Sequence, residues 1–241
     1  MNSLQVFVVF HKNLNINKYE NFDSYKNLIT FYGVKQKYNL NDSSLKFIYE
    51  YELPLYEPIW QSLSYNEGSA LLHVYKNKLH LNLEYIGFLQ YDMSINSNCF
   101  NIVKEELLTN SNTIFYKSFF DWAFLGGQTA IINNYPWFEA GLLNYNKYYN
   151  TNFTPNDLVN IKMITGNTFI ISSKLFSKMM KWLQQYYITN IPTLMQDKNS
   201  YSFNPGHIIE ALTGMYLALE VLQGAVYKKL EINDYRENNS L

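Results

Sequence analysis

The segment Leu4-Gln-Val-Phe-Val-Val-Phe10 is an apolar run rich in Val and Phe, and it stops at the polar residues His11-Lys12-Asn13. Such a run is typical of a strand that is buried on both faces of a parallel sheet. A second apolar run, Ile29 to Tyr32, ends at Gly33 and follows a segment around 21–28 that we expect to be helical. This order of strand, helix and strand predicts an α/β fold, with a mostly parallel central sheet flanked by helices.

The same alternation continues along the rest of the chain. The continuous apolar character of Glu84-Tyr-Ile-Gly-Phe-Leu-Gln-Tyr91 predicts a central strand that ends at Asp92. We expect a further strand over 168–171 and helices around 67–75, over 136–149, from Ser173 as its cap, and over about 207–222. No repeat or low-complexity linker marks a boundary, so residues 1–241 are predicted to form one domain, with a polar, frayed tail from about 234.

Composition excludes some classes of protein. The 241 residues carry 19 basic and 20 acidic groups, which argues against a basic nucleic-acid-binding surface. Among the basic residues Arg236 is the single arginine, although guanidinium is the usual group for bidentate binding of phosphate. A phosphorylated ligand would therefore depend on lysine, a metal ion or backbone groups.

The cysteine content and the hydropathy of the sequence indicate the cellular compartment in which the protein is expected. The single Cys99 cannot form an internal disulfide, and the N-terminus lacks the features of a secretory leader, so we expect a cytoplasmic, reducing environment. The most apolar stretch, 208–227, is interrupted by Glu210, Glu220 and Gln223. That pattern favours a buried helix, and we expect no transmembrane segment.

Several residues that could carry chemistry follow predicted strands. In open α/β sheets ligands bind beyond the carboxyl ends of the strands, where His11, Gly33 and Asp92 stand. His207 and Glu210, three residues apart, share one face of the last helix. Carboxylate and imidazole groups are suitable ligands for Mn²⁺ or Mg²⁺, and a second carboxylate could act as a general base. The alternative is that His207 and Glu210 are ordinary helix residues satisfied by local hydrogen bonds.

The chain resembles nucleotide-sugar-dependent glycosyltransferases of the GT-A fold, and most closely a small family often linked to capsule or surface-polysaccharide synthesis. The matching blocks span most of the chain; they are Val6 to Lys12, Asn66 to Asn77, Tyr85 to Tyr91, Asn167 to Ile171, and the helix of Glu210. Where that family usually has His-Tyr-Arg-Arg after the central strand, this chain has Gln90-Tyr-Asp-Met93, which is similar to a degenerate Asp-x-Asp metal motif. Where the family usually has Glu-Arg in the last helix, this chain has Glu210-Ala211, so both arginine positions are lost.

This resemblance implies a role for each candidate residue. Asp92 and then His207 would bind Mn²⁺ or Mg²⁺, and Glu210 would be the catalytic base if the reaction inverts the anomeric carbon. The remaining candidates would bind the donor, for which a UDP-sugar is favoured: Phe10, His11 and Gly33 at the base and ribose, Lys12 at the phosphates, and Glu67, Tyr91 and Asn167 around them. Glu67 has an alternative role in a capping box with Ser64, and Asn167 has one in an ordinary turn.

The functional prediction is a metal-dependent glycosyltransferase that moves a sugar from a nucleoside diphosphate to a hydroxyl of a glycan or surface polysaccharide. An alternative is a catalytically inactive relative that serves as a binding or partner subunit in glycan assembly, and the missing arginines favour it. A glycoside hydrolase would need a second carboxylate as well placed as Glu210, and the sequence offers none. The donor sugar, the acceptor, the stereochemistry and the oligomeric state stay open.

Overall fold

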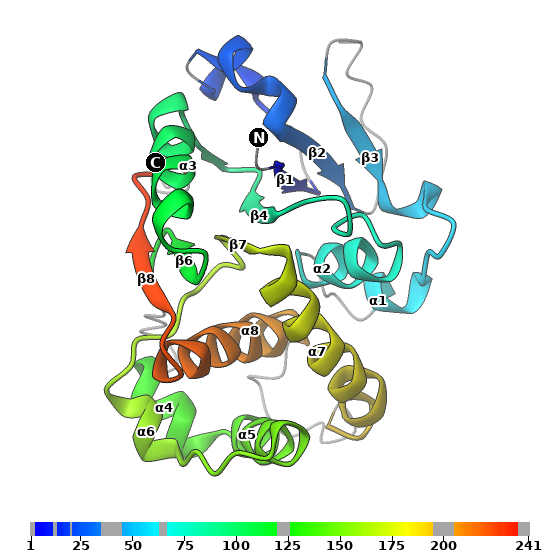
Figure 1. The fold of residues 1–241 in the computed structure, drawn as a ribbon. Helices are drawn as coiled ribbons and strands as arrows, with labels where there is room; N and C mark the ends of the chain where they lie inside the picture. Colours follow the sequence, from blue (N-terminus) through cyan, green and yellow to red (C-terminus); the bar gives the residue numbers. More distant parts are fainter. Residues whose placement is uncertain are drawn as a thin grey trace.

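A computed structural model describes residues 3–11, 14–19, 21–34, 45–62, 67–119, 126–194 and 205–235. Within these residues the chain builds a seven-stranded sheet in the order β3-β2-β1-β4-β7-β6-β8 (Figure 1). All of its strands run parallel except β7, which is antiparallel to both β4 and β6. The prediction of a mostly parallel α/β sheet is therefore confirmed.

The strands have the following bounds: β1 Leu4–Phe10, β2 Ile29–Gly33, β3 Phe47–Tyr49, β4 Tyr85–Gln90, β6 Thr113–Tyr116, β7 Phe169–Ser172 and β8 Val226–Lys229, with β5 Met93–Ser94 and β9 Asn233–Asp234 in a separate pair. The α-helices are α1 Pro58–Ser62, α2 Glu67–Lys76, α3 Ser97–Thr109, α4 Gly127–Asn134, α5 Pro136–Tyr149, α6 Pro155–Val159, α7 Ser173–Leu194 and α8 Pro205–Leu222. The segment expected to be helical around 21–28 consists of two short 3-10 turns, Phe22–Ser24 and Lys26–Leu28.

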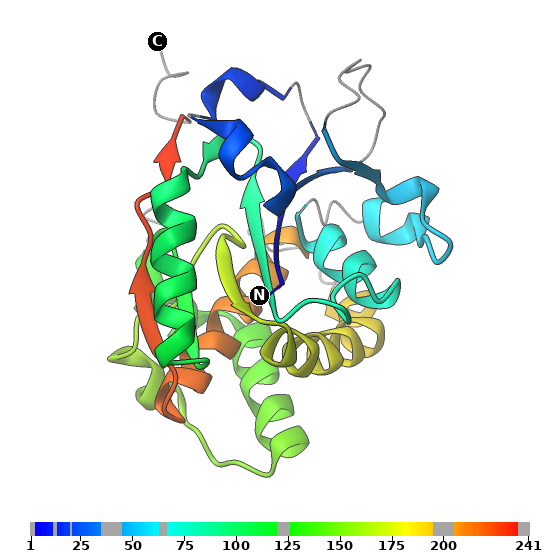
Figure 2. The ribbon, with the colours of Figure 1, turned by 45° about the horizontal axis from the view of Figure 1, so that its top comes forward.

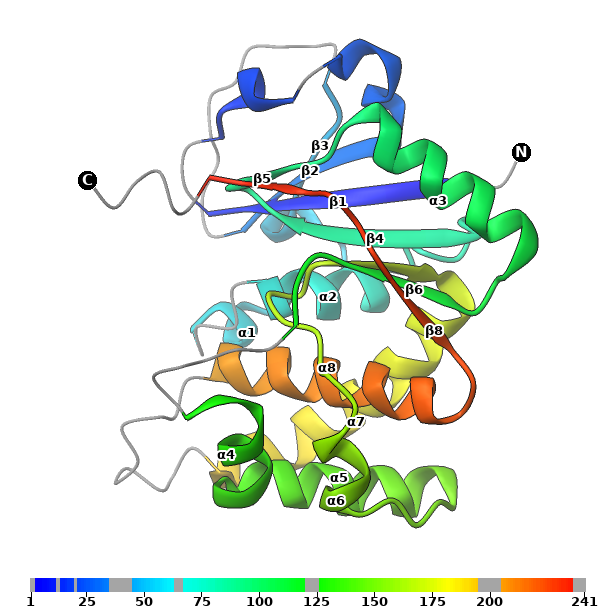
Figure 3. The ribbon, with the colours of Figure 1, turned by 90° about the vertical axis from the view of Figure 1, so that its left-hand side faces the viewer.

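Helices cover both faces of the sheet, which explains why its central strands are apolar throughout. Figure 3 shows α3 on one side and α2, α7 and α8 on the other, with α4, α5 and α6 forming a further layer beyond α8. All seven residues of β1 are buried. Alternate β1 side chains enter two separate cores, Phe7 and Val9 on the α8 side and Val6 and Val8 on the α3 side. None of the described helices is long and apolar enough to cross a membrane.

The start of α7 differs in detail from the prediction. The sequence predicts Ser173 as the cap of this helix, but Ser173 is the first helical residue, and the preceding Ser172 accepts a hydrogen bond from the Leu175 backbone N–H at 3.2 Å. The helix is amphipathic, because Phe176 and Met179 are buried while Lys174 and Lys178 are exposed. The proposed Ser64 cap of α2 lies outside the described residues.

The last residues that the structure describes, up to Tyr235, are held against the sheet, and the rest of the tail predicted from about 234 lies outside the described residues. We call residues 230–235 the C-terminal strap; it runs beside α3 (Figure 2). The Cys99 thiol donates to the Glu231 carbonyl at 3.0 Å, and β9 pairs with β5. The Tyr235 N–H then donates to the carbonyl of Asp92 at 2.9 Å. The strap thus closes over the strand end that carries Asp92.

The buried His80 gives a test of the fold that is independent of any function. Its ring stacks on Tyr75 and meets Phe176 edge-on, each at a centroid distance of 5.3 Å, and only 2% of the residue is exposed. Burial lowers the pKa of His80 below its usual 6.5, although a hydrogen bond with the Val74 backbone opposes the shift. As pH falls through about 6.5 the unfolded chain takes up a proton that the folded chain resists, so the stability is lost toward acid.

We therefore expect the pH dependence of unfolding to change in the variant His80→Phe, which keeps a ring but cannot titrate. Between pH 7.5 and 5.5 the wild-type free energy of unfolding should fall more steeply than that of the variant. Urea titrations at several pH values measure this difference. If the free energy of unfolding depends on pH in the same way in both proteins, His80 does not contribute to the loss of stability toward acid.

Candidate functional site

The carboxyl ends of three neighbouring strands meet at one edge of the sheet. In the parallel register Phe10 of β1 lies opposite Gly33 of β2, and Val9 lies opposite Gln90 of β4. Most of the predicted site residues either end these strands or follow them directly. We refer to this edge as the carboxyl edge.

His11, Glu67 and Tyr91 come from three different elements and meet at this edge. His11 follows β1, and its Nδ1 lies 4.0 Å from Oε1 of Glu67 at the start of α2. The His11 ring contacts Tyr91 edge-on, with centroids 5.0 Å apart. His11 and Glu67 keep about a fifth of their side-chain surface exposed, 21% and 19%. These three predicted donor-binding residues therefore form one cluster that a ligand could reach.

Phe10 and Gly33 are more deeply placed than the prediction assumed. Phe10 is fully buried, and Gly33 is buried beneath aromatic rings. A Cβ at Gly33 would lie 2.6 Å from Cδ1 of Tyr49 and 3.0 Å from Cζ of Phe10, so this packing itself requires glycine. The side chain of Phe10 supports the core, and contact of either residue with a nucleotide would have to come from the backbone.

Glu210 is anchored to the turn that precedes β7. Its Oε1 accepts hydrogen bonds from Thr165 Oγ1 at 2.5 Å and from the backbone N–H of Gly166. Within the described residues no hydrogen bond reaches its second oxygen, Oε2. The half-buried carboxylate thus fixes a turn with one oxygen and keeps the other for a further partner.

Gly166 and Asn167 form a strained turn beside Glu210. Both have positive φ, 72° and 45°, and such values are uncommon for a residue other than glycine. Asn167 is 6% exposed, and none of the described residues donates a hydrogen bond to its buried Oδ1. Strain and an unsatisfied buried acceptor at one residue are features that often accompany ligand binding.

Contacts around this turn connect α8 to the end of β4. A Cβ on Gly166 would lie 3.6 Å from Nε2 of Gln90, and Thr168 Oγ1 donates to Sδ of Met93 at 3.5 Å. On the other side a Cβ on Gly68 would lie 2.7 Å from Ile209, so α2 packs closely on α8 next to Glu210. The Glu210 turn and the Asp92 strand end are therefore neighbours at the carboxyl edge.

Asp92 is half-buried and is the second residue after the end of β4. Burial raises the pKa of the Tyr19 phenol, and the nearby phenols of Tyr25 and Tyr235 and the carboxylate of Asp92 raise it further. Tyr19 stays protonated as a result and donates to the Met93 carbonyl at 3.2 Å. The strand end carrying Asp92 is thus fixed from two sides, by Tyr19 and by the strap.

Two further residues, predicted to bind the metal ion and the phosphates, are less well defined. His207 is half-buried in the first turn of α8, one turn before Glu210. Lys12 lies outside the described residues. In the part of the chain that the structure describes, no group of three or more His, Cys, Asp or Glu side chains is arranged to hold a metal ion.

A buried polar network of Ser69, His73 and Glu50 was not predicted from the sequence. Ser69 Oγ donates to Glu50 Oε2 at 2.8 Å, and His73 Nδ1 lies 3.3 Å from the same oxygen. His73 Nε2 accepts from the Glu57 N–H at 2.9 Å, so a neutral ring carries its proton on Nδ1. All three side chains are fully buried. The network joins the segment after β3 to α2. Because Nε2 of His73 already accepts a hydrogen bond and Nδ1 carries the proton, His73 cannot take a proton from Ser69 and make it a nucleophile.

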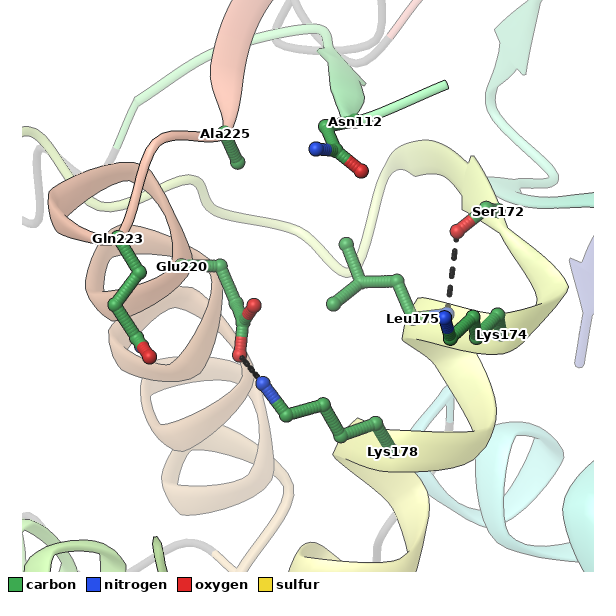
Figure 4. A pocket seen from close by; sticks show the side chains of 8 residues that line it. All are labelled: Asn112, Ser172, Lys174, Leu175, Lys178, Glu220, Gln223 and Ala225. Atoms are coloured by element: carbon green, nitrogen blue, oxygen red, sulfur yellow. Dashed lines mark hydrogen bonds and ion pairs between the residues drawn. The ribbon is translucent and has the colours of Figure 1, made fainter.

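A polar pocket of about 200 Å³ lies at the opposite edge of the sheet, between α7 and α8 (Figure 4). Asn112 precedes β6, Ala225 precedes β8, and Ser172 ends the antiparallel β7, so all three mark the amino ends of the parallel strands. Lys178 and Glu220 form an ion pair of 2.7 Å beside this pocket. It is therefore separate from the residues gathered at the carboxyl edge.

Comparison with known proteins supports the fold assignment. No protein-family model matches the chain, and no curated protein is similar to it in sequence. Among solved structures the chain is similar to the apo structure of WbbM, a bifunctional glycosyltransferase, with a TM-score of 0.61 and 15% sequence identity. The match covers 98% of this chain and 46% of that one, so this chain spans less than half the length of WbbM. The chain thus has a glycosyltransferase-like, α/β fold, whereas its relation to a capsule family stays a prediction.

Proposed function

We propose that this protein is a glycosyltransferase that moves a sugar from a nucleoside diphosphate to an acceptor hydroxyl. The observation that carries the proposal is the grouping of Asp92, Glu210 and the strained Gly166-Asn167 turn at the carboxyl edge. This edge is where open α/β sheets bind ligands. The likeness in fold to a bifunctional glycosyltransferase supports the same class of reaction.

The donor would lie along the carboxyl edge. His11, Glu67 and Tyr91 would contact the nucleoside, together with the backbone of Phe10 and Gly33, and Lys12 would assist at the phosphates. Asn167 would bind a sugar hydroxyl, because its buried Oδ1 can accept a hydrogen bond that the described residues do not supply. UDP is the nucleotide that we favour.

The residues at the end of β4 fit a divalent ion that arrives with the donor. Asp92 would hold Mn²⁺ or Mg²⁺, with His207 as a second ligand, since such ions commonly bind one or two carboxylates together with substrate phosphates. The ion would stabilise negative charge on the leaving diphosphate. The oxygen chemistry of Asp92 suits this role, and its carbonyl, bound to the Tyr235 N–H, keeps the strand end in place.

For an inverting reaction Glu210 is the proposed base. The acceptor oxygen would form a bond to the anomeric carbon while the bond from that carbon to the diphosphate oxygen breaks. The acceptor proton would pass to Oε2 of Glu210, and the electron pair of the broken bond would leave with the diphosphate. A glycan or surface polysaccharide is the acceptor that we favour, and the single, unpaired Cys99 supports a cytoplasmic, reducing location.

Binding of the donor is testable by thermal unfolding. We expect UDP or a UDP-sugar at about 100 times its Kd, with Mn²⁺, to raise the Tm by about 5 °C, because a ligand stabilises the fold that it binds. The screen should include the other nucleoside diphosphates, each with and without the ion, and adenosine as a control without a diphosphate. Absence of a shift with every nucleoside diphosphate would contradict the proposal.

Release of the nucleoside diphosphate in the presence of acceptors distinguishes an active transferase from the alternative, an inactive partner subunit. An active transferase releases UDP only when both donor and acceptor are present. A protein that binds the donor with Mn²⁺ but never releases UDP from it, whichever acceptor is added, would be the partner subunit.

A further inference from the structure

Lys18 is held over an aromatic ring at the carboxyl edge. Its Nζ lies 4.4 Å from the centre of the Tyr235 ring, and its side chain is half-buried. The Tyr235 hydroxyl also donates to the Lys18 carbonyl at 3.3 Å. Within the described residues no carboxylate forms an ion pair with Lys18. An aromatic face attracts an ammonium group without neutralising its charge, so Lys18 keeps a positive charge for another partner.

Two tyrosines connect Lys18 to the strand end of Asp92. Tyr235 carries the Lys18 ammonium on its ring, and its N–H binds the Asp92 carbonyl. Its hydroxyl also lies 3.2 Å from Ser94 Oγ. Tyr19, the residue after Lys18, donates to the Met93 carbonyl at 3.2 Å. Tyr235 thus connects Lys18 to the strand end of Asp92, although the two residues are far apart in sequence.

Another lysine at the same edge is already neutralised. Lys117 follows β6 and forms an ion pair with Asp234 of the strap, in which both side chains are largely buried, with 14% and 16% exposed. Breaking such a pair to bind a ligand would leave a buried carboxylate unpaired, which is costly. Lys18 can bind an anion without that cost. Its connection through Tyr235 to the strand end of Asp92 also distinguishes it from exposed lysines elsewhere on the surface.

We propose that Lys18 binds the diphosphate of the donor and that Tyr235 positions it beside Asp92. This inference rests on the proposed function, which requires a diphosphate at Asp92. It also agrees with the composition, in which Arg236 is the single arginine and a phosphorylated ligand needs another cation. An ammonium group is a compact charge with three donors, and on a ring it is fixed in place, so Lys18 supplies part of what a guanidinium would supply.

The experiment measures binding of UDP, pyrophosphate and uridine to the full chain by titration calorimetry. In Lys18→Met we expect the Kd for UDP and for pyrophosphate to rise about tenfold, because a charge-assisted contact is lost. The affinity for uridine should not change. The matched control is Lys174→Met, since Lys174 is an exposed lysine beside the pocket at the opposite edge.

Two variants of Tyr235 test its positioning role. Tyr235→Phe keeps the ring under Lys18 and should retain most of the UDP affinity. Tyr235→Leu removes the ring, and its Kd for UDP should rise as in Lys18→Met. In Tyr235→Leu the additional change Lys18→Met should then have little further effect, because the two residues act as one unit. An independent, additive loss would overturn the positioning role.

The possible outcomes separate this inference from the proposed function. If the wild-type protein binds UDP and Lys18→Met binds it equally well, the role of Lys18 is wrong and the proposed function stands. If pyrophosphate binding depends on Lys18 but no nucleoside diphosphate binds, the anion site stands and the proposed function is wrong. If the wild-type protein binds neither pyrophosphate nor any nucleoside diphosphate, both are wrong.

Discussion

Asp92→Asn is expected to raise the Kd of UDP in the presence of Mn²⁺ by at least about 100-fold. The substitution keeps the size of the side chain but removes the negative charge and one carboxylate oxygen, and hard divalent ions prefer such oxygens. In the absence of Mn²⁺ the affinity should change little. Calorimetric titration of both proteins with UDP, with and without the ion, measures the effect.

The fold should tolerate the same substitution. The Asp92 contact that holds the strap uses the backbone carbonyl, which the substitution does not alter, and the side chain is only half-buried. We expect the free energy of unfolding to change by less than about 1 kcal/mol. Asp23→Asn is a matched control, because Asp23 is a surface carboxylate with 92% of its side chain exposed. Equal Mn²⁺-dependent affinity in Asp92→Asn and wild type would remove Asp92 from the role of metal ligand.

The sheet could be predicted because strands that are buried on both faces have continuous apolar sequences. The runs 4–10 and 84–91 are apolar without alternation, and both became central strands. The helix predicted over 136–149 has those bounds in the structure, where Pro136 opens it and Asn150 ends it in a left-handed conformation. Local chemistry thus fixes both ends of that helix.

Strand direction and very short strands could not be predicted in this way. A four-residue apolar run such as β7 carries no sign of whether it runs parallel or antiparallel. β5 and β9 have two residues each, which is too short for any periodic pattern, and they pair residues about 140 positions apart. Asp234, where the predicted polar tail begins, is held by pairing with Met93 and by an ion pair with Lys117, and neither contact could be inferred from composition.

The site was predictable only as far as strand ends could be recognised. The rule that ligands bind beyond the carboxyl ends led to His11 and Asp92, which the structure places at one edge. The contact of His11 with Glu67 and the placement of Lys18 depend on how separate elements pack, and no local pattern records that. The shortage of arginine indicated that lysine, a metal ion or backbone groups would bind a phosphate, but it did not indicate Lys18 in particular.

Glu210→Gln is expected to lower kcat by about 10³-fold if the reaction is inverting, because a general base contributes about 10²–10⁴-fold. The glutamine carbonyl can still accept the hydrogen bonds that Thr165 and Gly166 donate to Oε1. The turn that carries Asn167 should therefore keep its conformation. We expect the Kd for UDP and the free energy of unfolding to stay close to their wild-type values.

Comparison with Thr165→Val and Glu210→Ala distinguishes the structural role of Oε1 of Glu210 from the proposed catalytic role of Oε2. Thr165→Val removes one hydrogen bond to Oε1 and leaves the carboxylate, so it should weaken the hold on the turn and keep a base. Glu210→Ala removes both functions, leaves the Gly166 N–H without its acceptor, and should reduce donor affinity and stability together with turnover. Steady-state rates of UDP release, with calorimetric binding of UDP, measure these effects.

A base at Oε2 requires that Glu210→Gln lose turnover while it keeps donor binding, because only the proton acceptor has changed. If Glu210→Gln turns over normally while Glu210→Ala loses donor affinity, the carboxylate serves only to hold the turn. The reaction would then retain configuration or use a different base, and analysis of the anomeric configuration of the product would decide between these two. The same carboxylate can thus be assigned a chemical or a structural role because its two oxygens have different partners.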